Sequence, residues 1–293
     1  MNEITYQHTP VLYKEVCELA NKPSSYLDGT YGRGGHCKLL IEQCSLSEVY
    51  VIDKDPEAIL NAEILKKEQD RLNFNIHHGA FHQLDQFLKN NQVDLMLFDL
   101  GVSSPQLDDP QRGFSFNQVG PLDMRMDNTR GQSAADLITS LSEEDLANII
   151  YEYGEETQSR KIAKAISTAK LQTKIKDTAT LAQIIELAIP RRGKIHPATK
   201  TFQALRIAVN QELDHVTQLL ESAHKFIKPN GRIIIISFHS LEDRIVKNQF
   251  KEWKDKGYGK IITKKCITAS DEEIKNNKRA RSAKLRCFEV RAA

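Results

Sequence analysis

The stretch that decides the fold is Asp28-Gly29-Thr30-Tyr31-Gly32-Arg33-Gly34-Gly35-His36, which follows the apolar pair Tyr26-Leu27. It places four glycines and an acid directly after a short apolar segment. Glycine tolerates positive φ and has no Cβ, so a strand can turn sharply into a helix here and present backbone amides to a ligand. Phosphate-, nucleotide- and S-adenosylmethionine-binding folds all use such a turn, so the motif predicts a ligand site without naming the ligand.

Short apolar runs alternate with helix-like periodicity on both sides of this turn. Strands are predicted over residues 25–28, 48–53, 73–77, 93–98 and 231–237, with two late strands over 260–265 and 284–290. Helices are predicted over residues 37–43, 56–69 and 81–89, and one long helix over 199–227. This alternation is typical of an α/β fold with a parallel sheet covered on both faces.

Residues 108–196 interrupt the alternation with a helical block. Helix periodicity is present over residues 142–151, 159–169 and 178–188, and Ser142 and Thr178 are typical of helix N-terminal caps. We therefore predict a discontinuous α/β domain from residues 1–107 and 197–293, and an inserted all-helical domain from residues 108–196.

Composition limits the class of protein. The chain has 293 residues, 40% of them hydrophobic, which is enough for a core. No apolar run approaches the roughly 20 residues of a membrane span, and Met1-Asn2-Glu3 lacks the features of a signal peptide, so we expect a cytoplasmic protein with no membrane partner. The five cysteines are odd in number and contain no C-x-x-C pair, so we expect reduced thiols and no metal site.

Charge is distributed unevenly along the chain. The net charge is +2, but residues 244–293 hold fifteen Lys and Arg against six Asp and Glu, so the first 243 residues sum to about −7. A local cationic surface on a neutral or acidic body is what a polyanion-binding enzyme needs. A lysine-rich solvated surface explains the same charge equally well.

Three predicted strands are each followed by, or end with, an acid: Asp28, Asp53 and Asp99. Ligands of open parallel sheets bind beyond the carboxyl ends of the strands, and an acid about twenty residues past the glycines is placed to accept from ribose hydroxyls. Dinucleotide enzymes share that acid. Asp28 favours S-adenosylmethionine instead, because a carboxylate repels a pyrophosphate but attracts an ammonium.

Several longer segments resemble one family. They are His8-Thr9-Pro10-Val11-Leu12, the glycine-rich run 28–36, Asp99-Leu100-Gly101-Val102-Ser103-Ser104-Pro105-Gln106-Leu107-Asp108, Arg112-Gly113-Phe114-Ser115-Phe116, Gly120-Pro121-Leu122-Asp123-Met124-Arg125-Met126, the run 196–206 and Ser237-Phe238-His239-Ser240-Leu241-Glu242-Asp243-Arg244. In order and spacing they are similar to the RsmH (MraW) family, bacterial small-subunit rRNA methyltransferases that modify the exocyclic amine of a cytosine in the decoding centre. Lys200 stands where an arginine is common, and residues 251–275 are more individual.

The resemblance implies a Rossmann-like class I S-adenosylmethionine-dependent methyltransferase sheet, with the helical insert recognising RNA. It also implies the cofactor contacts. Gly34, Gly35 and His36 are expected at the methionine end, Asp53 at the ribose, Phe81 near the adenine, Asp99 at the adenine edge or the amino-acid side, and Gln106 as a further contact, beside Asp28 from the charge argument.

Methyl transfer to an amine is an in-line displacement that needs positioning more than covalent help. We expect acceptors that draw on the amine protons, namely Asp99 or nearby carbonyls with Ser103 and Ser104, and His239 as a further candidate. Methylation of a ring carbon would instead need a cysteine, commonly one that follows a proline, and no cysteine here follows a proline.

The implied partner is 16S rRNA or the 30S subunit, and we expect no DNA partner. A monomer and a homodimer are equally compatible with the sequence. Expected phosphate contacts flank or belong to the insert, or lie in the basic run 278–286: Arg112, Arg125, Arg191, Arg192, Lys194, Lys200 and Lys278-Arg279-Ala280-Arg281-Ser282-Ala283-Lys284-Leu285-Arg286. Two alternatives stay open, a nicotinamide dehydrogenase and a non-catalytic ribosome-assembly factor with the same fold.

Overall fold

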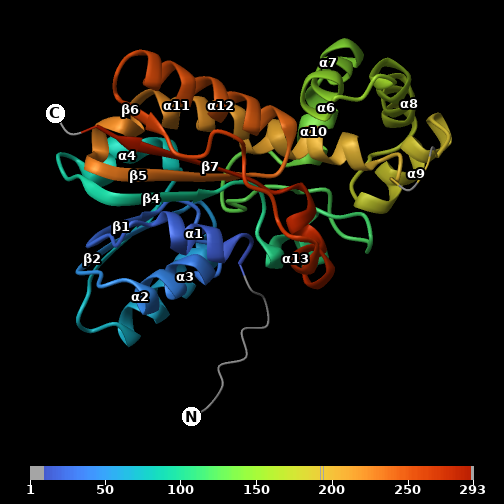
Figure 1. The fold of residues 1–293 in the computed structure, drawn as a ribbon. Coiled ribbons are helices and arrows are strands. Elements are labelled where there is room, and N and C mark those ends of the chain that lie inside the picture. Colours follow the sequence, from blue (N-terminus) through green and yellow to red (C-terminus); the bar gives the residue numbers. More distant parts are fainter. Residues whose placement is uncertain (1–9, 192, 194, 292–293) are drawn as a thin grey trace. The chain divides into compact units, whose positions relative to one another are not determined.

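The computed structural model describes residues 10–191, 193 and 195–291. The chain forms two compact units (Figure 1). The first contains the residues up to Gly101 and those from Leu213 onward, and the second is Val102–Glu212. Among the described residues, no helix is both long enough and apolar enough to cross a membrane.

The first unit is built on a seven-stranded sheet in the order β3-β2-β1-β4-β5-β7-β6. The strands are β1 (Ser25–Asp28), β2 (Glu48–Asp53), β3 (Asn73–His78), β4 (Val93–Asp99), β5 (Ile227–Ser237), β6 (Gly259–Ile261) and β7 (Lys284–Val290). Neighbours from β3 to β5 are parallel, as predicted. The last strands depart from the predicted parallel arrangement, because β7 runs antiparallel to both β5 and β6.

Helices cover both faces of this sheet, as predicted (Figure 1). One face is covered by α1 (Tyr13–Leu19), α2 (Gly35–Gln43) and α3 (Pro56–Glu68), whose side chains Val16, Leu40 and Leu65 join one apolar core. The other is covered by α4 (Leu84–Leu88), α11 (Glu212–Ser222) and α12 (Ser240–Asp255), whose side chains Leu84, Leu219 and Phe250 join a second core. Short elements complete the unit: η1 (Phe81–Gln83), η3 (Ala223–Phe226), α13 (Asp271–Asn276) and η4 (Lys278–Ser282).

Strand register brings the three predicted acids to one edge of the sheet. Asp28 pairs with Val51 of β2 and with Leu97 of β4. Asp53 and Asp99 are the last residues of β2 and β4. All three carboxylates therefore project from the carboxyl edge, where ligands of parallel sheets bind.

The second unit is helical and has its own apolar core. It contains α5 (Ser104–Asp108), η2 (Pro110–Arg112), α6 (Ala134–Ser140), α7 (Glu143–Gly154), α8 (Ser159–Gln172), α9 (Thr178–Ala188) and α10 (Thr199–Asn210). Its bounds differ from the predicted 108–196, since it begins at Val102 and ends at Glu212. The reason is packing: Phe202 and Leu205 of α10 are buried in the same core as Leu146 and Ile150 of α7.

The predicted long helix 199–227 is two helices. The chain leaves the helical conformation at Gln211, where φ is 51°, and α11 begins at the next residue. The side chain of Asn210 is held just before the break: its Nδ2 donates to the carbonyl of Met124 at 2.7 Å, and its Oδ1 accepts from the amide of Met126 at 2.8 Å. Apolar periodicity continues across the break, so it predicted one helix.

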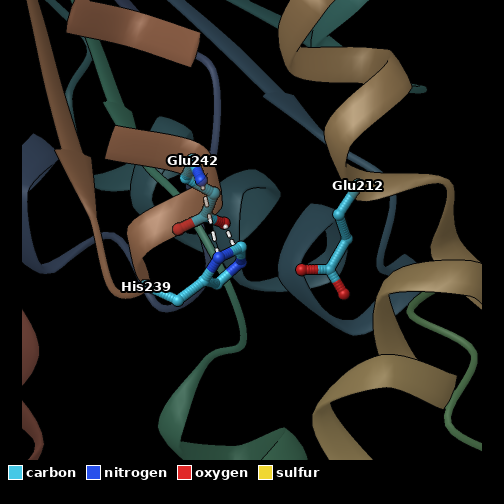
Figure 2. Close-up of side chains that lie close together, drawn as sticks. All are labelled: Glu212, His239 and Glu242. Carbon is cyan, nitrogen blue, oxygen red and sulfur yellow. Dashed lines mark hydrogen bonds and ion pairs between the residues drawn. The ribbon is translucent and has the colours of Figure 1, made fainter. Parts of the chain in front are cut away.

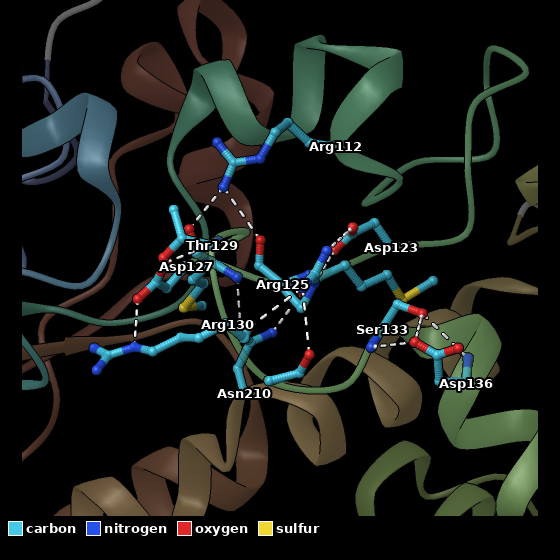
Figure 3. A network of polar contacts seen from close by, with 12 residues as sticks. Arg112, Asp123, Arg125, Asp127, Thr129, Arg130, Ser133, Asp136 and Asn210 are labelled. Atoms are coloured by element: carbon cyan, nitrogen blue, oxygen red, sulfur yellow. Dashed lines mark hydrogen bonds and ion pairs between the residues drawn. The ribbon is translucent and has the colours of Figure 1, made fainter.

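Arg112 of η2 and Arg125 form polar contacts that hold the loop before α6 (Figure 3). Arg112 is buried, and its Nη2 donates to the carbonyls of Arg125 at 3.2 Å and Met126 at 2.7 Å. Arg125 holds both carboxylate oxygens of Asp123, at 2.8 and 2.7 Å. Both guanidinium groups thus bind groups inside the unit, and the RNA phosphate contacts predicted for Arg112 and Arg125 stay predictions.

Candidate functional site

The glycine-rich loop after β1 is tied to all three acidic strand ends. The amide of Thr30 donates to Asp28 Oδ1 at 3.3 Å, and the amide of Gly32 donates to Asp53 Oδ2 at 2.7 Å. The amide of Asp99 donates to the Thr30 hydroxyl at 2.6 Å. Thr30 thus joins β1 to β4, so the loop and the carboxylates form one fixed group. This role of Thr30 was not predicted, although the residue lies within the glycine-rich run 28–36.

Two glycines of the loop allow it to pack tightly. Gly34 is the left-handed N-cap of α2, with φ 71°, and a Cβ there would lie 2.4 Å from the Tyr31 hydroxyl oxygen. A Cβ on Gly35 would lie 2.6 Å from Cγ of Pro10. Tyr31 is itself buried and donates to Asn61 at 3.1 Å, so its ring has little freedom to move aside. Both positions therefore need glycine.

Replacing Gly34 by alanine should lower the free energy of unfolding by about 2–4 kcal/mol, because the positive φ and the contact with Tyr31 both oppose a Cβ. Gly131 provides the matched control. It has a similar φ of 79° but nothing within 4 Å of the added Cβ, so its alanine variant should lose only about 1 kcal/mol. Urea unfolding measures both, and equal losses would show that the Tyr31 contact has no effect.

Asp28 is buried, Asp53 and Asp99 are partly buried, and all three carboxyl groups are hard to ionise. Burial, and after it the charges of Asp28 and Glu242, together raise the pKa of Asp99 to about 8. Burial raises the pKa of Asp28 to about 7 against hydrogen bonds from Tyr26 and Thr30, and that of Asp53 to about 6 against backbone hydrogen bonds. Among the described residues, no lysine or arginine forms an ion pair with any of the three. A cationic ligand would relieve this cost.

His36 lies beside Asp99 at the start of α2. Its Nε2 is 3.7 Å from Asp99 Oδ2, and burial lowers its pKa to about 4, so the imidazole is neutral at neutral pH. Within the described part of the chain, neither His36 Nε2 nor Asp99 Oδ1 has a hydrogen-bond partner. Buried polar atoms are normally paired, and unpaired ones are common at sites that a ligand completes.

Phe81 lies near the Asp53 end of the site. Its ring meets the edge of Phe98, with centroids 5.8 Å apart, and that of His215 in α11, with centroids 6.4 Å apart. Nδ1 of His215 is 2.7 Å from Nζ of Lys54, the residue after Asp53. Phe81 is only partly buried, so its ring has surface left to contact a flat ligand.

His239 is the N-cap of α12 (Figure 2). Its Nδ1 accepts from the amide of Glu242 at 3.5 Å, and its Nε2 is 3.2 Å from Glu242 Oε1. The other carboxylate oxygen of Glu242 accepts from the amide of Phe238 at 2.9 Å. Glu242 was not predicted as a site residue. It is 1% exposed, and its charge raises the pKa of Asp99. The sequence pattern that could have indicated Glu242 is an acid three residues after a helix N-cap.

Ser103, Ser104 and Gln106 belong to the second unit. Ser103 is the N-cap of α5, and its amide donates to Gln106 Oε1 at 2.9 Å. Gln106 is buried, and Ser104 is partly exposed at the first position of the helix. Local helix capping explains the Ser103–Gln106 contact, and the roles of the three residues towards a ligand stay predictions.

The other residues expected to contact RNA differ in their exposure and in their partners within the protein. Arg191 is exposed, Lys200 Nζ donates to the carbonyl of Glu155 at 2.8 Å, and Arg192 and Lys194 lie outside the described residues. In the run 278–286, Arg286 pairs with Asp243 at 2.6 Å and Lys284 with the same carboxylate at 3.6 Å. The phosphate contacts predicted for Arg191, Lys200 and the run stay predictions.

Comparisons with known proteins agree with this geometry. The chain matches the MraW methylase family over residues 5–291. It is 46% identical to the ribosomal RNA small subunit methyltransferase H of Acinetobacter baylyi, over 96% of this chain and 98% of that protein. It is 45% identical to the protein of the same name from Coprothermobacter proteolyticus, over 96% of this chain and 95% of that one. The chain belongs to the MraW methylase family.

Proposed function

We propose that this protein transfers a methyl group from S-adenosylmethionine to the exocyclic amine, N4, of a cytidine in the decoding region of 16S rRNA. The observation that carries the proposal is the group of three carboxyls with raised pKa values, Asp28, Asp53 and Asp99, at one sheet edge, with no ion pair to a lysine or arginine among the described residues. The family assignment and the printed names of the relatives support the reaction type and the RNA class. Such a substrate places the reaction in the bacterial cytoplasm.

The residues present fit this cofactor. Its ammonium and sulfonium are cations, and Asp28 and Asp99 are the acidic groups that would become ionised beside them. Asp53 already accepts from the amides of Gly32 and Asp55, but each carboxylate oxygen has two lone pairs, so it can still accept from ribose hydroxyls. Phe81 would contact the adenine, and Gly34, Gly35 and His36 would lie at the methionine end.

When bound, the cofactor supplies an electrophilic methyl group. The protein has to hold the amine in line with it and accept hydrogen bonds from the amine protons, since the nitrogen lone pair is delocalised into the ring. Asp99 is the best-placed acceptor in the first unit, because its Oδ1 has no partner within the described residues. His239 is a weaker candidate, since its ring already faces Glu242. Ser103 and Ser104 remain candidates from their place in the chain.

The helical second unit is the proposed RNA-recognition domain. A base in structured RNA must leave its stack to reach a buried site, which requires contacts on the surrounding strand. The two alternatives are weaker. A dehydrogenase would place a pyrophosphate beside the glycine loop, where Asp28 opposes it, and an assembly factor without catalysis has no physical need for three carboxyls with raised pKa values at one sheet edge.

Methyl transfer tests the proposal directly. Purified protein, methyl-labelled S-adenosylmethionine and small subunits from cells that lack the gene should give labelled 16S rRNA. We expect saturable binding of S-adenosylmethionine in calorimetric titration and none of NADH. Binding of the cofactor without transfer to any small-subunit RNA would favour the assembly factor, and binding of NADH alone would favour the dehydrogenase.

A further inference from the structure

Three lysines line one exposed face of α12. Their spacing of four and three residues places them on the same side of a helix. They are Lys247, Lys251 and Lys254, all exposed, and we call them the α12 stripe. The opposite face is buried in the core of the first unit through Val246, Phe250 and Trp253. The helix backbone is therefore fixed, and the stripe is displayed on a rigid support.

The acids of α12 do little to neutralise the stripe. The N-terminal acids are engaged elsewhere: Glu242 faces His239, and Asp243 pairs with Arg286 and Lys284 of β7. Near the C-terminal end, Glu252 pairs with Lys256 at 2.6 Å. Asp255 is the one further acid of the helix, four residues after Lys251. The stripe therefore carries three positive charges against one nearby negative charge.

Folding alone does not account for this arrangement. Like charges three or four residues apart destabilise a helix by about 0.2–0.5 kcal/mol for each pair. The stripe contains two such neighbouring pairs along one face. In the basic run 278–286, by contrast, Arg286 and Lys284 are satisfied by Asp243, and Ala280, Ala283 and Leu285 are buried. Much of that run supports the fold, whereas the α12 stripe is left facing solvent.

We propose that the α12 stripe binds the phosphate backbone of the substrate RNA, outside the target nucleotide. The inference rests on the proposed function and names a surface for it. From Lys247 to Lys254 the stripe spans about 10 Å at 1.5 Å per residue, enough for more than one phosphate. An open hollow borders it, lined by Asn248, Lys251, Glu252, Asp255 and Lys256. Contacts of this kind fix register without reading sequence.

The test compares two charge-matched triple variants of the full chain. The stripe variant is Lys247→Gln, Lys251→Gln and Lys254→Gln, and the control variant is Lys66→Gln, Lys67→Gln and Arg71→Gln. The control side chains are also exposed and lie at the end of α3 and just after it. Binding of 16S rRNA is measured against salt concentration, together with S-adenosylmethionine affinity and the kinetics of methyl transfer.

The stripe variant should bind RNA about 10- to 100-fold more weakly at low salt, and its salt slope should fall by about two. The KM for RNA should rise, with kcat at saturating RNA and cofactor affinity kept. The control variant should match wild type. A stripe variant with the wild-type slope and affinity, or a control that loses as much, would overturn the inference. Wild type that neither binds nor methylates the RNA would instead overturn the proposed function.

Discussion

Replacing Asp99 by asparagine should stabilise the fold and weaken cofactor binding in the same protein. Burial raises the pKa of the Asp99 carboxyl to about 8, so the folded state holds a proton that the unfolded chain releases at neutral pH. Keeping that group un-ionised costs stability, and asparagine is a neutral residue of nearly the same shape. It also cannot attract an ammonium or a sulfonium, so we expect the affinity for S-adenosylmethionine to fall about tenfold or more.

The gain in stability has a definite pH dependence. Below the unfolded pKa of about 3.9 both states are protonated, so wild type and Asp99→Asn should be equally affected by pH. As pH rises towards 8, wild type loses stability because its folded state binds more protons than its unfolded state. The advantage of the variant should therefore grow with pH, to about 1–3 kcal/mol near pH 8. Urea unfolding at several pH values measures it.

Asp94→Asn is a matched control for which we expect the opposite change in stability. At this residue burial would raise the pKa, but hydrogen bonds from Ser24, Ser25 and Lys228 lower it overall. Asp94→Asn should therefore destabilise the protein at neutral pH, with a deficit that shrinks as pH falls. If Asp99→Asn instead behaves like Asp94→Asn, the carboxyl of Asp99 has a cationic or hydrogen-bonding partner within the protein, and the argument for an uncompensated site fails.

Local patterns predicted most elements of the first unit. The bounds of β1, β2 and β7 agree with the predicted ranges. In β2 an apolar run lies between Glu48 and Asp53, whereas in β7 charged residues are interspersed with buried apolar ones. The direction of β7 was not predictable, since a strand of this composition pairs equally well either way. The break at Gln211 was also missed, because Asn210 is held by backbone groups of Met124 and Met126, far away in the sequence.

The candidate site was predictable where chemistry follows the strand ends. Asp28, Asp53 and Asp99 were found because the carboxyl ends of parallel strands lie at one edge. The cations were harder to interpret, because a basic residue in a sequence carries no information about its partner. Arg112 and Arg125 satisfy carbonyls and Asp123, whereas Lys247 and Lys251 face solvent. Only the fold separates these two uses of positive charge.

The most direct test of the central claim is nucleoside mass spectrometry of 16S rRNA from a strain that lacks the gene, restored with wild type or with Asp99→Ala. The account predicts that one N4-methylated cytidine of the decoding region disappears in the deletion strain and returns with wild type. It also predicts no return with Asp99→Ala, provided that immunoblotting shows equal protein levels. An unchanged cytidine in the deletion strain would contradict the proposed reaction, and full restoration by Asp99→Ala would contradict the proposed site.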